Sequence, residues 1–203
     1  MKESIFVTGI GTGVGKTICA AVLTQYWKAD YWKPVQSGDL SASDSMTISH
    51  LLNGDVLIHP ERYRLTFPAS PHKSALRDGV SIQLTDFKRP VTANHLVVEG
   101  AGGLLVPLND EDSILDLITS LNIPVALVVR DYLGCINHSL LSIEVLRYRH
   151  IPLKYLIFNG AIDIDSERVI RRSLTKDTKV LHIPELGVVT AIHIKNIADQ
   201  IIF

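Results

Sequence analysis

The chain has 203 residues, of which 46% are hydrophobic and 20% are charged, and this is the length and composition of one globular domain rather than of a disordered chain. Its net charge of −1 gives no electrostatic reason to expect nucleic acid or an acidic membrane as a partner. With only Cys19 and Cys135, a disulfide framework is not expected. We therefore predict a single cytoplasmic domain over residues 1–203.

Strand-length apolar runs alternate with helical patterns along the chain. A strand is predicted at residues 5–7, with no signal peptide before it, and a Gly-rich turn and a helix at 17–28 follow. Another strand is predicted at 31–35, and residues 67–92 are predicted to be irregular with short helices. The remaining predicted strands are 96–98, 125–129, 153–158 and 180–183, and the remaining predicted helices are 113–121, 136–149, 166–174 and 191–202. Continuous apolar runs are typical of strands buried on both faces of a parallel sheet, so the pattern predicts an α/β layered fold.

The strongest local signal is the segment at residues 8–17, TGIGTGVGKT, which follows a predicted strand and opens a predicted helix. In that context a Gly-rich loop directs backbone N–H groups and a helix N-terminus at phosphates. Lys16 can reach the terminal phosphates, and Thr17 can offer its hydroxyl to Mg2+. The loop is one residue longer than the strict P-loop spacing, because the first glycine is Gly9 and Ile10 stands where that pattern has Gly.

Two acidic residues are candidates to complete a magnesium site beside this loop. Glu99 follows the apolar run at 95–98 and precedes the glycine-rich segment at 100–103, as a Walker B acid does. The alternative for Glu99 is a carboxylate bonded only to turn amides. Asp44 stands near the start of a predicted helix, where by itself it is interpreted as an N-terminal helix acid or cap.

Five separated motifs resemble those of the dethiobiotin synthetase family, in the family's order and approximate spacing. They are GxxTxxGKT at residues 9–17, KPVxSG at 33–38, SPH at 70–72, VEGAGG at 98–103 and LGCINH at 133–138. The longer phosphate loop is this family's own variant. The resemblance implies a three-layer α/β fold of the P-loop NTPase type, with a mostly parallel central sheet flanked by helices.

The resemblance also implies roles for individual residues. Lys16, Lys33 and Ser37 would act in catalysis, and Thr17, Asp44 and Glu99 would hold Mg2+. The nucleotide would contact Gly13, Val14, Gly15, Lys16, Thr17, Asp44, Glu99, Gly100, Ala101, Gly102, Asn159, Gly160, Pro184, Glu185 and Leu186. The substrate would contact Thr12, Lys33 and Ser37 and, near the interface of a homodimer, Gly134, Cys135, Ile136 and Asn137.

The activity that the resemblance implies is a ligase reaction of biotin biosynthesis, dependent on ATP and Mg2+. It would close the cyclic urea of dethiobiotin from 7,8-diaminononanoate and CO2, through a carbamate and a carbamic–phosphoric anhydride. This chemistry needs no covalent protein nucleophile, so positioning and charge neutralisation would supply most of the catalysis.

Three departures and three rival interpretations bear on this expectation. Gly11 stands where an Asp is common in the family, Gly13 where some members have Glu, and Gly160 where some have Asp.

An amidating synthetase of the same P-loop group would need a glutaminase domain, for which 203 residues leave no room. A partitioning-type nucleotide switch carries an additional Lys early in the loop, which residues 10–14 do not contain. A Cys135 nucleophile is disfavoured because no paired acid is evident in the sequence.

Overall fold

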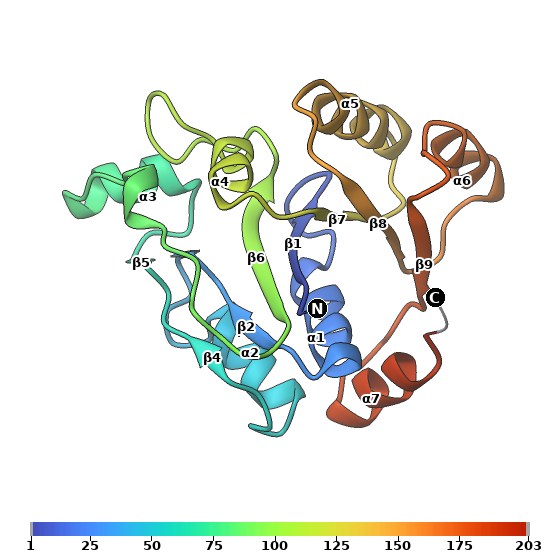
Figure 1. Cartoon of the computed structure of the whole chain (residues 1–203), viewed down its shortest axis with the longest axis horizontal. Helices are drawn as coiled ribbons and strands as arrows, with labels where there is room; N and C mark the ends of the chain where they lie inside the picture. The colour runs from blue at the N-terminus through green and yellow to red at the C-terminus, as the bar shows by residue number, and fades with distance from the viewer. Residues whose placement is uncertain (1, 202–203) are drawn as a thin grey trace.

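The computed structural model describes residues 2–201, and its centre is a seven-stranded sheet in which neighbouring strands are parallel (Figure 1). The strand order is β4–β2–β6–β1–β7–β8–β9. The bounds are Ser4–Gly9 for β1, Asp30–Trp32 for β2, Ile58–His59 for β4, Leu96–Gly103 for β6, Val125–Val129 for β7, Leu153–Asn159 for β8 and Lys179–Ile183 for β9. The predicted mostly parallel α/β sheet is confirmed. The two central strands β1 and β7 are buried along almost their whole length, as continuous apolar runs predict.

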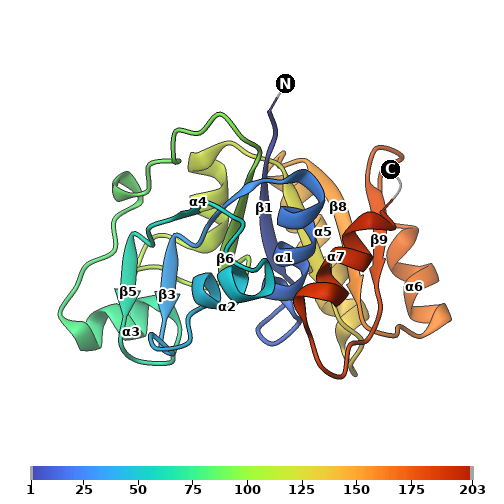
Figure 2. The same ribbon diagram turned by 90° about the horizontal axis from the view of Figure 1, so that it is seen from below.

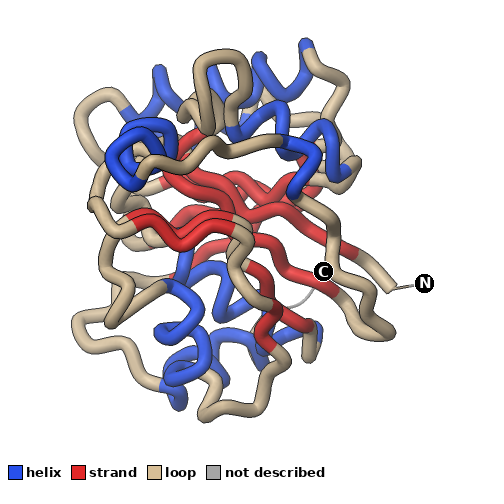
Figure 3. The backbone as a smooth tube through the Cα atoms, turned by 90° about the vertical axis from the view of Figure 1, so that its left-hand side faces the viewer, coloured by secondary structure: helices blue, strands red, loops and turns tan. Residues whose placement is uncertain are grey.

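Helices cover both faces of this sheet and complete three layers (Figures 1 and 3). One face carries α1, α2 and α7, which span Lys16–Trp27, Asp44–Leu51 and Ala191–Asp199. The other face carries α4, α5 and α6, which span Ile114–Leu121, Cys135–Tyr148 and Ile164–Arg171. The last helix was predicted to reach residue 202; it ends at Asp199, before residues 200 and 201, and residue 202 lies outside the described residues. Within residues 2–201, no helix combines the length and the apolar character that crossing a bilayer requires.

The prediction of one strand over residues 31–35 is wrong, because the chain turns at Lys33 and Pro34. Proline has no N–H to give to a sheet ladder, so β2 ends at Trp32 and a separate strand, β3, begins at Val35. β3 (Val35–Ser37) pairs in parallel with β5 (Tyr63–Leu65) in a second, two-stranded sheet. Figure 2 shows this small sheet at one side of the molecule, next to α3 (Pro71–Asp78).

One further difference concerns length rather than type. β6 was predicted to end at residue 98, but it continues through Gly103, so Glu99 lies inside the strand and is 1% exposed. The segment 67–92 contains α3 and a short 3-10 helix, Leu84–Asp86, as predicted. Because β6 pairs with both β1 and β2, Glu99 is placed between the phosphate loop after β1 and the turn after β2.

Asp30 opens β2 and is the buried centre of a polar cluster at the opposite end of the strand from the turn at Lys33. Its carboxylate accepts hydrogen bonds from Thr92 Oγ1 (2.5 Å) and Asn94 Nδ2 (2.9 Å), and it pairs with His59 Nε2 at 3.1 Å. Burial alone would raise the pKa of Asp30, but the contacts with Thr92, Asn94 and His59 outweigh it and lower that pKa below its usual value. The cluster ties β2 to β4 and to the segment before β6.

The Asp30 cluster predicts a loss of stability in acid. A carboxylate whose pKa is lower in the folded state stabilises the fold above its unfolded pKa, and this contribution is lost as the pH falls through the folded pKa. At about pH 7, Asp30→Asn should lower the free energy of unfolding by about 1–3 kcal/mol, and the difference from the parent protein should shrink below about pH 4. Urea unfolding of the parent and the variant at a series of pH values measures the loss and its pH dependence. A difference in the free energy of unfolding that stays constant down to the lowest pH would contradict this role of Asp30.

Candidate active site

A cavity of about 710 Å3 lies where the phosphate loop, the turn after β2, β3 and β6 meet. It brings together many of the residues predicted from sequence, namely Thr12, Gly13, Gly15, Lys16, Thr17, Lys33, Ser37, Asp44, Glu99, Ala101 and Gly102. It is also lined by Ser70 and Pro71 of the SPH motif and by residues to which the sequence reasoning gave no role, among them Gln36, Asp39, Pro68 and Ala69. The remaining predicted residues lie outside this lining, and most of them belong to two other groups described below.

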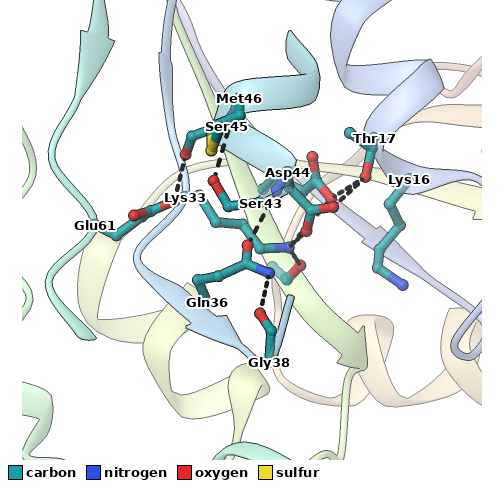
Figure 4. Close-up of polar contacts among 12 residues, drawn as sticks. Lys16, Thr17, Lys33, Gln36, Gly38, Ser43, Asp44, Ser45, Met46 and Glu61 are labelled. Atoms are coloured by element: carbon teal, nitrogen blue, oxygen red, sulfur yellow. Dashed lines mark hydrogen bonds and ion pairs between the residues drawn. The ribbon is translucent and has the colours of Figure 1, made fainter. Parts of the chain in front are cut away.

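Two carboxylates and one hydroxyl converge on the floor of this cavity (Figure 4). Thr17 Oγ1 lies 3.0 Å from Asp44 Oδ1 and 2.9 Å from Glu99 Oε1. These three side chains come from α1, α2 and β6, so only the folded chain assembles them. Lys33 completes the cluster, with its Nζ 2.6 Å from Asp44 Oδ2 and 3.2 Å from Glu99 Oε1.

Lys33 and Asp44 hold each other in their ionised forms. Burial by itself would lower the pKa of Lys33, but the charges of Glu99 and Asp44 more than compensate and raise it above its usual value. Burial would raise the pKa of Asp44, but the ammonium of Lys33 lowers it below its usual value. The buried Lys33 is therefore a cation, and it contacts both carboxylates, those of Asp44 and Glu99.

The oxygen donors at this position fit a magnesium ion. Mg2+ takes hard oxygen ligands, few of them from the protein, and shares the rest with water and nucleotide phosphates. Thr17, Asp44 and Glu99 present such oxygens to one point. Across residues 2–201, no cluster of three or more His, Cys, Asp or Glu side chains is placed to hold a metal. A cation bound here would therefore depend on two carboxylates, one hydroxyl and oxygens supplied by the ligand.

Lys16 is the second cation of the cavity, and it is bent back onto its own loop. Its Nζ donates to the carbonyl oxygen of Gly11 at 2.9 Å. Burial and the nearby charge of Lys33 lower its pKa from the usual range to about 8, against the opposing effect of Glu99 and Asp44. An anion bound at the phosphate loop would therefore stabilise the protonated form of Lys16.

Tyr31 is a member of the site that the sequence reasoning missed. Its hydroxyl donates to Glu99 Oε2 at 2.8 Å, and its side chain is 0% exposed. Burial, together with the negative charge of Glu99, raises the pKa of Tyr31 well above its usual value, so the phenol remains a donor. No signal in the sequence singles out Tyr31, because its contact with Glu99 arises only when β2 pairs with β6.

Gln36 and Ser37 on β3 both line the cavity, but the side chain of Gln36 is hydrogen-bonded and the hydroxyl of Ser37 is not. Gln36 Oε1 accepts from the backbone N–H of Asp44 at 3.2 Å and Gln36 Nε2 donates to the carbonyl oxygen of Gly38 at 3.0 Å, so this side chain fixes the start of α2. Ser43 caps the same helix, which leaves the Asp44 side chain free to face Thr17. Ser37 Oγ is buried and has no hydrogen-bond partner. A buried hydroxyl without a partner beside a cavity is suited to bind a polar group of a ligand.

Asn159 and the residues after β8 and β9 form a second group of predicted residues. Asn159 Nδ2 donates to the carbonyl oxygen of Val14 at 2.9 Å and so supports the phosphate loop from beneath. Gly15 has φ of 87°, and a Cβ there would lie 1.9 Å from Asn159 Nδ2. Only glycine fits both the backbone conformation and the neighbour at this point of the loop.

At the end of β8, Gly160 lies against Glu185 in the segment that follows β9. A Cβ at Gly160 would lie 2.2 Å from Glu185 Oε2, and Glu185 Oε1 is 2.6 Å from Arg130 Nη2. Pro184 and Leu186 flank Glu185 in the same segment. The predicted Asn159, Gly160 and 184–186 residues are therefore neighbours along the carboxyl edge of the sheet, and Arg130 is a member of this group that the sequence reasoning missed.

The segment Gly134, Cys135, Ile136 and Asn137 opens α5 and does not line the 710 Å3 cavity. Gly134 caps the helix with φ of 110°, and no side chain caps the free N–H groups there. Cys135 Sγ lies 3.4 Å from Asp131 Oδ1, and burial together with this carboxylate raises the pKa of the thiol. The sequence showed no acid paired with Cys135, whereas the structure places Asp131 there; burial and this carboxylate keep the thiol neutral, and a neutral thiol is a poor nucleophile.

Comparison with known proteins adds relatives and structural neighbours to this geometry. A family model described as an AAA domain matches residues 3–193. The chain is 47% identical over 173 residues to the ATP-dependent dethiobiotin synthetase BioD of Christiangramia forsetii, covering 85% of this chain and 83% of that protein. It is 49% identical over 170 residues to the BioD of Cytophaga hutchinsonii, covering 83% and 82%. The biotin biosynthesis bifunctional protein BioCD of Bordetella avium is 43% identical over 191 residues, which are 93% of this chain and 41% of that protein.

Among solved structures, a putative plasmid partition protein of Borrelia burgdorferi bound to AMPPNP superimposes with a TM-score of 0.55 and 13% identity, covering 98% of this chain and 97% of that one. A nucleotide-binding protein of Archaeoglobus fulgidus in complex with ADP gives 0.53 and 11%, covering 97% and 85%. At such identities the likeness concerns the fold, and it confirms the predicted P-loop NTPase architecture.

The pKa of Lys16 predicts how nucleotide binding depends on pH. A bound polyphosphate favours the protonated lysine, so binding should take up a proton once the free protein has lost it above about pH 8. The affinity for AMPPNP in EDTA should be flat below about pH 7.5 and fall by up to about tenfold per pH unit above 8. Calorimetric titration across this range measures it. Lys16→Gln should bind weakly with a flat profile, and an equally steep decline in that variant would assign the titration elsewhere.

Proposed function

We propose that this protein closes the ureido ring of dethiobiotin from 7,8-diaminononanoate and CO2 with ATP and Mg2+. The chain belongs to the ATP-dependent dethiobiotin synthetase family, and a family model described as an AAA domain spans most of it. It is therefore an enzyme of biotin biosynthesis. The observation that carries the proposal for the site is the meeting of Lys16 and Lys33 with Thr17, Asp44 and Glu99 in one cavity. This set can neutralise a polyphosphate and a carbamate together, and the proposed reaction needs no covalent protein nucleophile.

The proposed reaction has three balanced steps. An amine of the substrate attacks CO2, and after loss of a proton the product is a carbamate. A carbamate oxygen then takes the γ-phosphoryl group of ATP, which releases ADP and forms a carbamic–phosphoric anhydride. The second amine attacks the carbonyl carbon, the C–O bond to phosphate breaks, and the five-membered urea closes with loss of a proton.

The two lysines would serve the anions of this sequence. Lys16 would leave the carbonyl oxygen of Gly11 for the terminal phosphates of ATP, which its lowered pKa favours. Lys33 stands between Asp44 and Glu99 at the end of β2, from where it would face the carbamate and the transferring phosphoryl group. Thr17, Asp44 and Glu99 would hold Mg2+, which when bound supplies positive charge to the phosphate oxygens.

The substrate would occupy the part of the cavity nearest β3. Ser37 would donate its unpaired buried hydroxyl to the carbamate or ureido region. A second, apolar cavity of about 370 Å3 shares Thr12 and Val106 with the main one, and Leu105 and Leu141 line it. An alkyl chain attached to the two amines would fit there, with its reacting end in the main cavity.

The remaining predicted residues would bind the phosphates and the adenine of the nucleotide and the carboxylate of the substrate. Gly13 to Thr17 and Gly100 to Gly102 would follow the phosphates, and Asn159, Gly160 and residues 184–186 would surround the adenine. Gly134 to Asn137 would offer the free N–H groups of α5 to the substrate carboxylate, and because they do not line the main cavity they would do so across a homodimer interface. We place this activity in one cytoplasmic domain over residues 1–203.

The proposed function predicts a product that needs four components. The purified protein should convert labelled bicarbonate into acid-stable label in a compound with the mass of dethiobiotin when ATP, Mg2+ and 7,8-diaminononanoate are present. Carbamates lose CO2 in acid, so stable label reports ring closure. Omitting any one component should abolish it. ATP hydrolysis that proceeds without diamine and yields no stable label would instead indicate a nucleotide switch.

Ser37→Ala tests the substrate side of the cavity separately. The change removes a hydroxyl that lacks a partner in the ligand-free protein, so the thermal midpoint should not fall. The KM for the diamine or the turnover should worsen about tenfold or more, which corresponds to one lost hydrogen bond to a charged group. The Kd for AMPPNP should remain unchanged. A lower midpoint with unchanged kinetics would mean that Ser37 serves the fold alone.

A further inference from the structure

Tyr31 and Lys33 approach Glu99 from the same strand end. Tyr31 lies in β2 and Lys33 in the turn that follows it, and both side chains reach Glu99, whereas the indole of Trp32 donates to the carbonyl oxygen of Pro60 at 3.1 Å. Tyr31 is in register with Val97 on β6, two residues before Glu99. The pairing of β2 with β6 therefore fixes the distance between the phenol and the carboxylate.

The two oxygens of Glu99 have different partners. Oε1 lies 2.9 Å from the hydroxyl of Thr17 and 3.2 Å from Lys33 Nζ. Oε2 accepts a hydrogen bond from Tyr31 at 2.8 Å, and among residues 2–201 this is its one donor. The carboxylate is thus held by one contact on the side away from Thr17 and by two contacts on the side facing it.

A cation at this site would compete for Oε1 but not for Oε2. It would displace the hydrogen bonds that Thr17 and Lys33 make with Oε1, because these occupy the lone pairs that a metal uses. The contact with Tyr31 can persist through that exchange. Groups that bond a metal-binding carboxylate from behind fix its orientation and its basicity, and their removal commonly costs about 10- to 100-fold in metal affinity or activity.

We propose that Tyr31 is a positioning residue for the metal site, whose hydroxyl holds the carboxylate of Glu99 with Oε1 turned toward Thr17 and Asp44 and so raises the affinity for Mg2+. The inference rests on the proposed metal-binding role of Glu99. It assigns to Tyr31 a task that packing alone does not explain, since a phenylalanine would fill the same buried volume.

Tyr31→Phe tests the inference with its ring retained. The Kd of AMPPNP is measured by calorimetry in EDTA and across a Mg2+ titration. In the variant, the Mg2+ concentration that gives half of the metal-dependent tightening should rise about 10- to 100-fold, while the Kd in EDTA and the thermal midpoint remain within about twofold and a few degrees of the parent values.

Two further variants separate the outcomes. Tyr63→Phe is the matched control, because this buried tyrosine also donates to a carboxylate, that of Asp86, and it does not line the cavity; its Mg2+ dependence should be unchanged. Glu99→Gln should lose most of the Mg2+ effect.

If Glu99→Gln loses the Mg2+-dependent tightening and Tyr31→Phe does not, the role of Tyr31 is refuted and the metal site stands. A Kd in EDTA that rises as much as the Mg2+ requirement shows a structural role and also refutes it. If Glu99→Gln keeps the full Mg2+ effect, the metal assignment itself fails and the inference fails with it.

Discussion

The buried ammonium of Lys33 between Asp44 and Glu99 is the interaction on which the site depends. Its side chain is 4% exposed, and a charge so far from water must be paired to be tolerated. The three residues belong to the turn after β2, the start of α2 and the interior of β6, so pairing them holds these segments together. Removing one partner would leave an excess charge in the interior. Since an apolar replacement can stabilise a core equally well, the pair is better explained by what it offers a ligand.

The ligand-free site is neutralised by its own members. Two lysines face two carboxylates, and the carbonyl oxygen of Gly11 and the hydroxyl of Thr17 take up further hydrogen bonds. A nucleotide with its cation would bring phosphate oxygens to the lysines and positive charge to the carboxylates, so binding would exchange internal partners for external ones. Ser37 is the exception, because its hydroxyl has no internal partner to give up.

Local pattern was enough to predict the phosphate loop and most strands of the sheet, since each is a short segment with its own composition. Glu99 and Asp44 could be identified only by family resemblance and by position next to a strand or helix. Tyr31 could not be identified, because its role depends on a contact with a residue 68 positions away that the pairing of β2 with β6 creates. The division of residues 31–35 into two strands was equally hidden. A proline beside an apolar run can mark an edge or a break, and tertiary pairing decides which.

Asn159 shows that the two ends of the site are not independent. Its amide nitrogen supports the carbonyl oxygen of Val14, and its side chain occupies the space that a Cβ at Gly15 would need. The loop that faces the phosphates is therefore built on the residue at the carboxyl end of β8, next to Gly160 and Glu185. A change on this edge of the sheet alters the support of the loop as well as any contact with a base. Lost phosphate binding in such a variant would follow from the same hydrogen bond, with no change to Lys16 or Thr17.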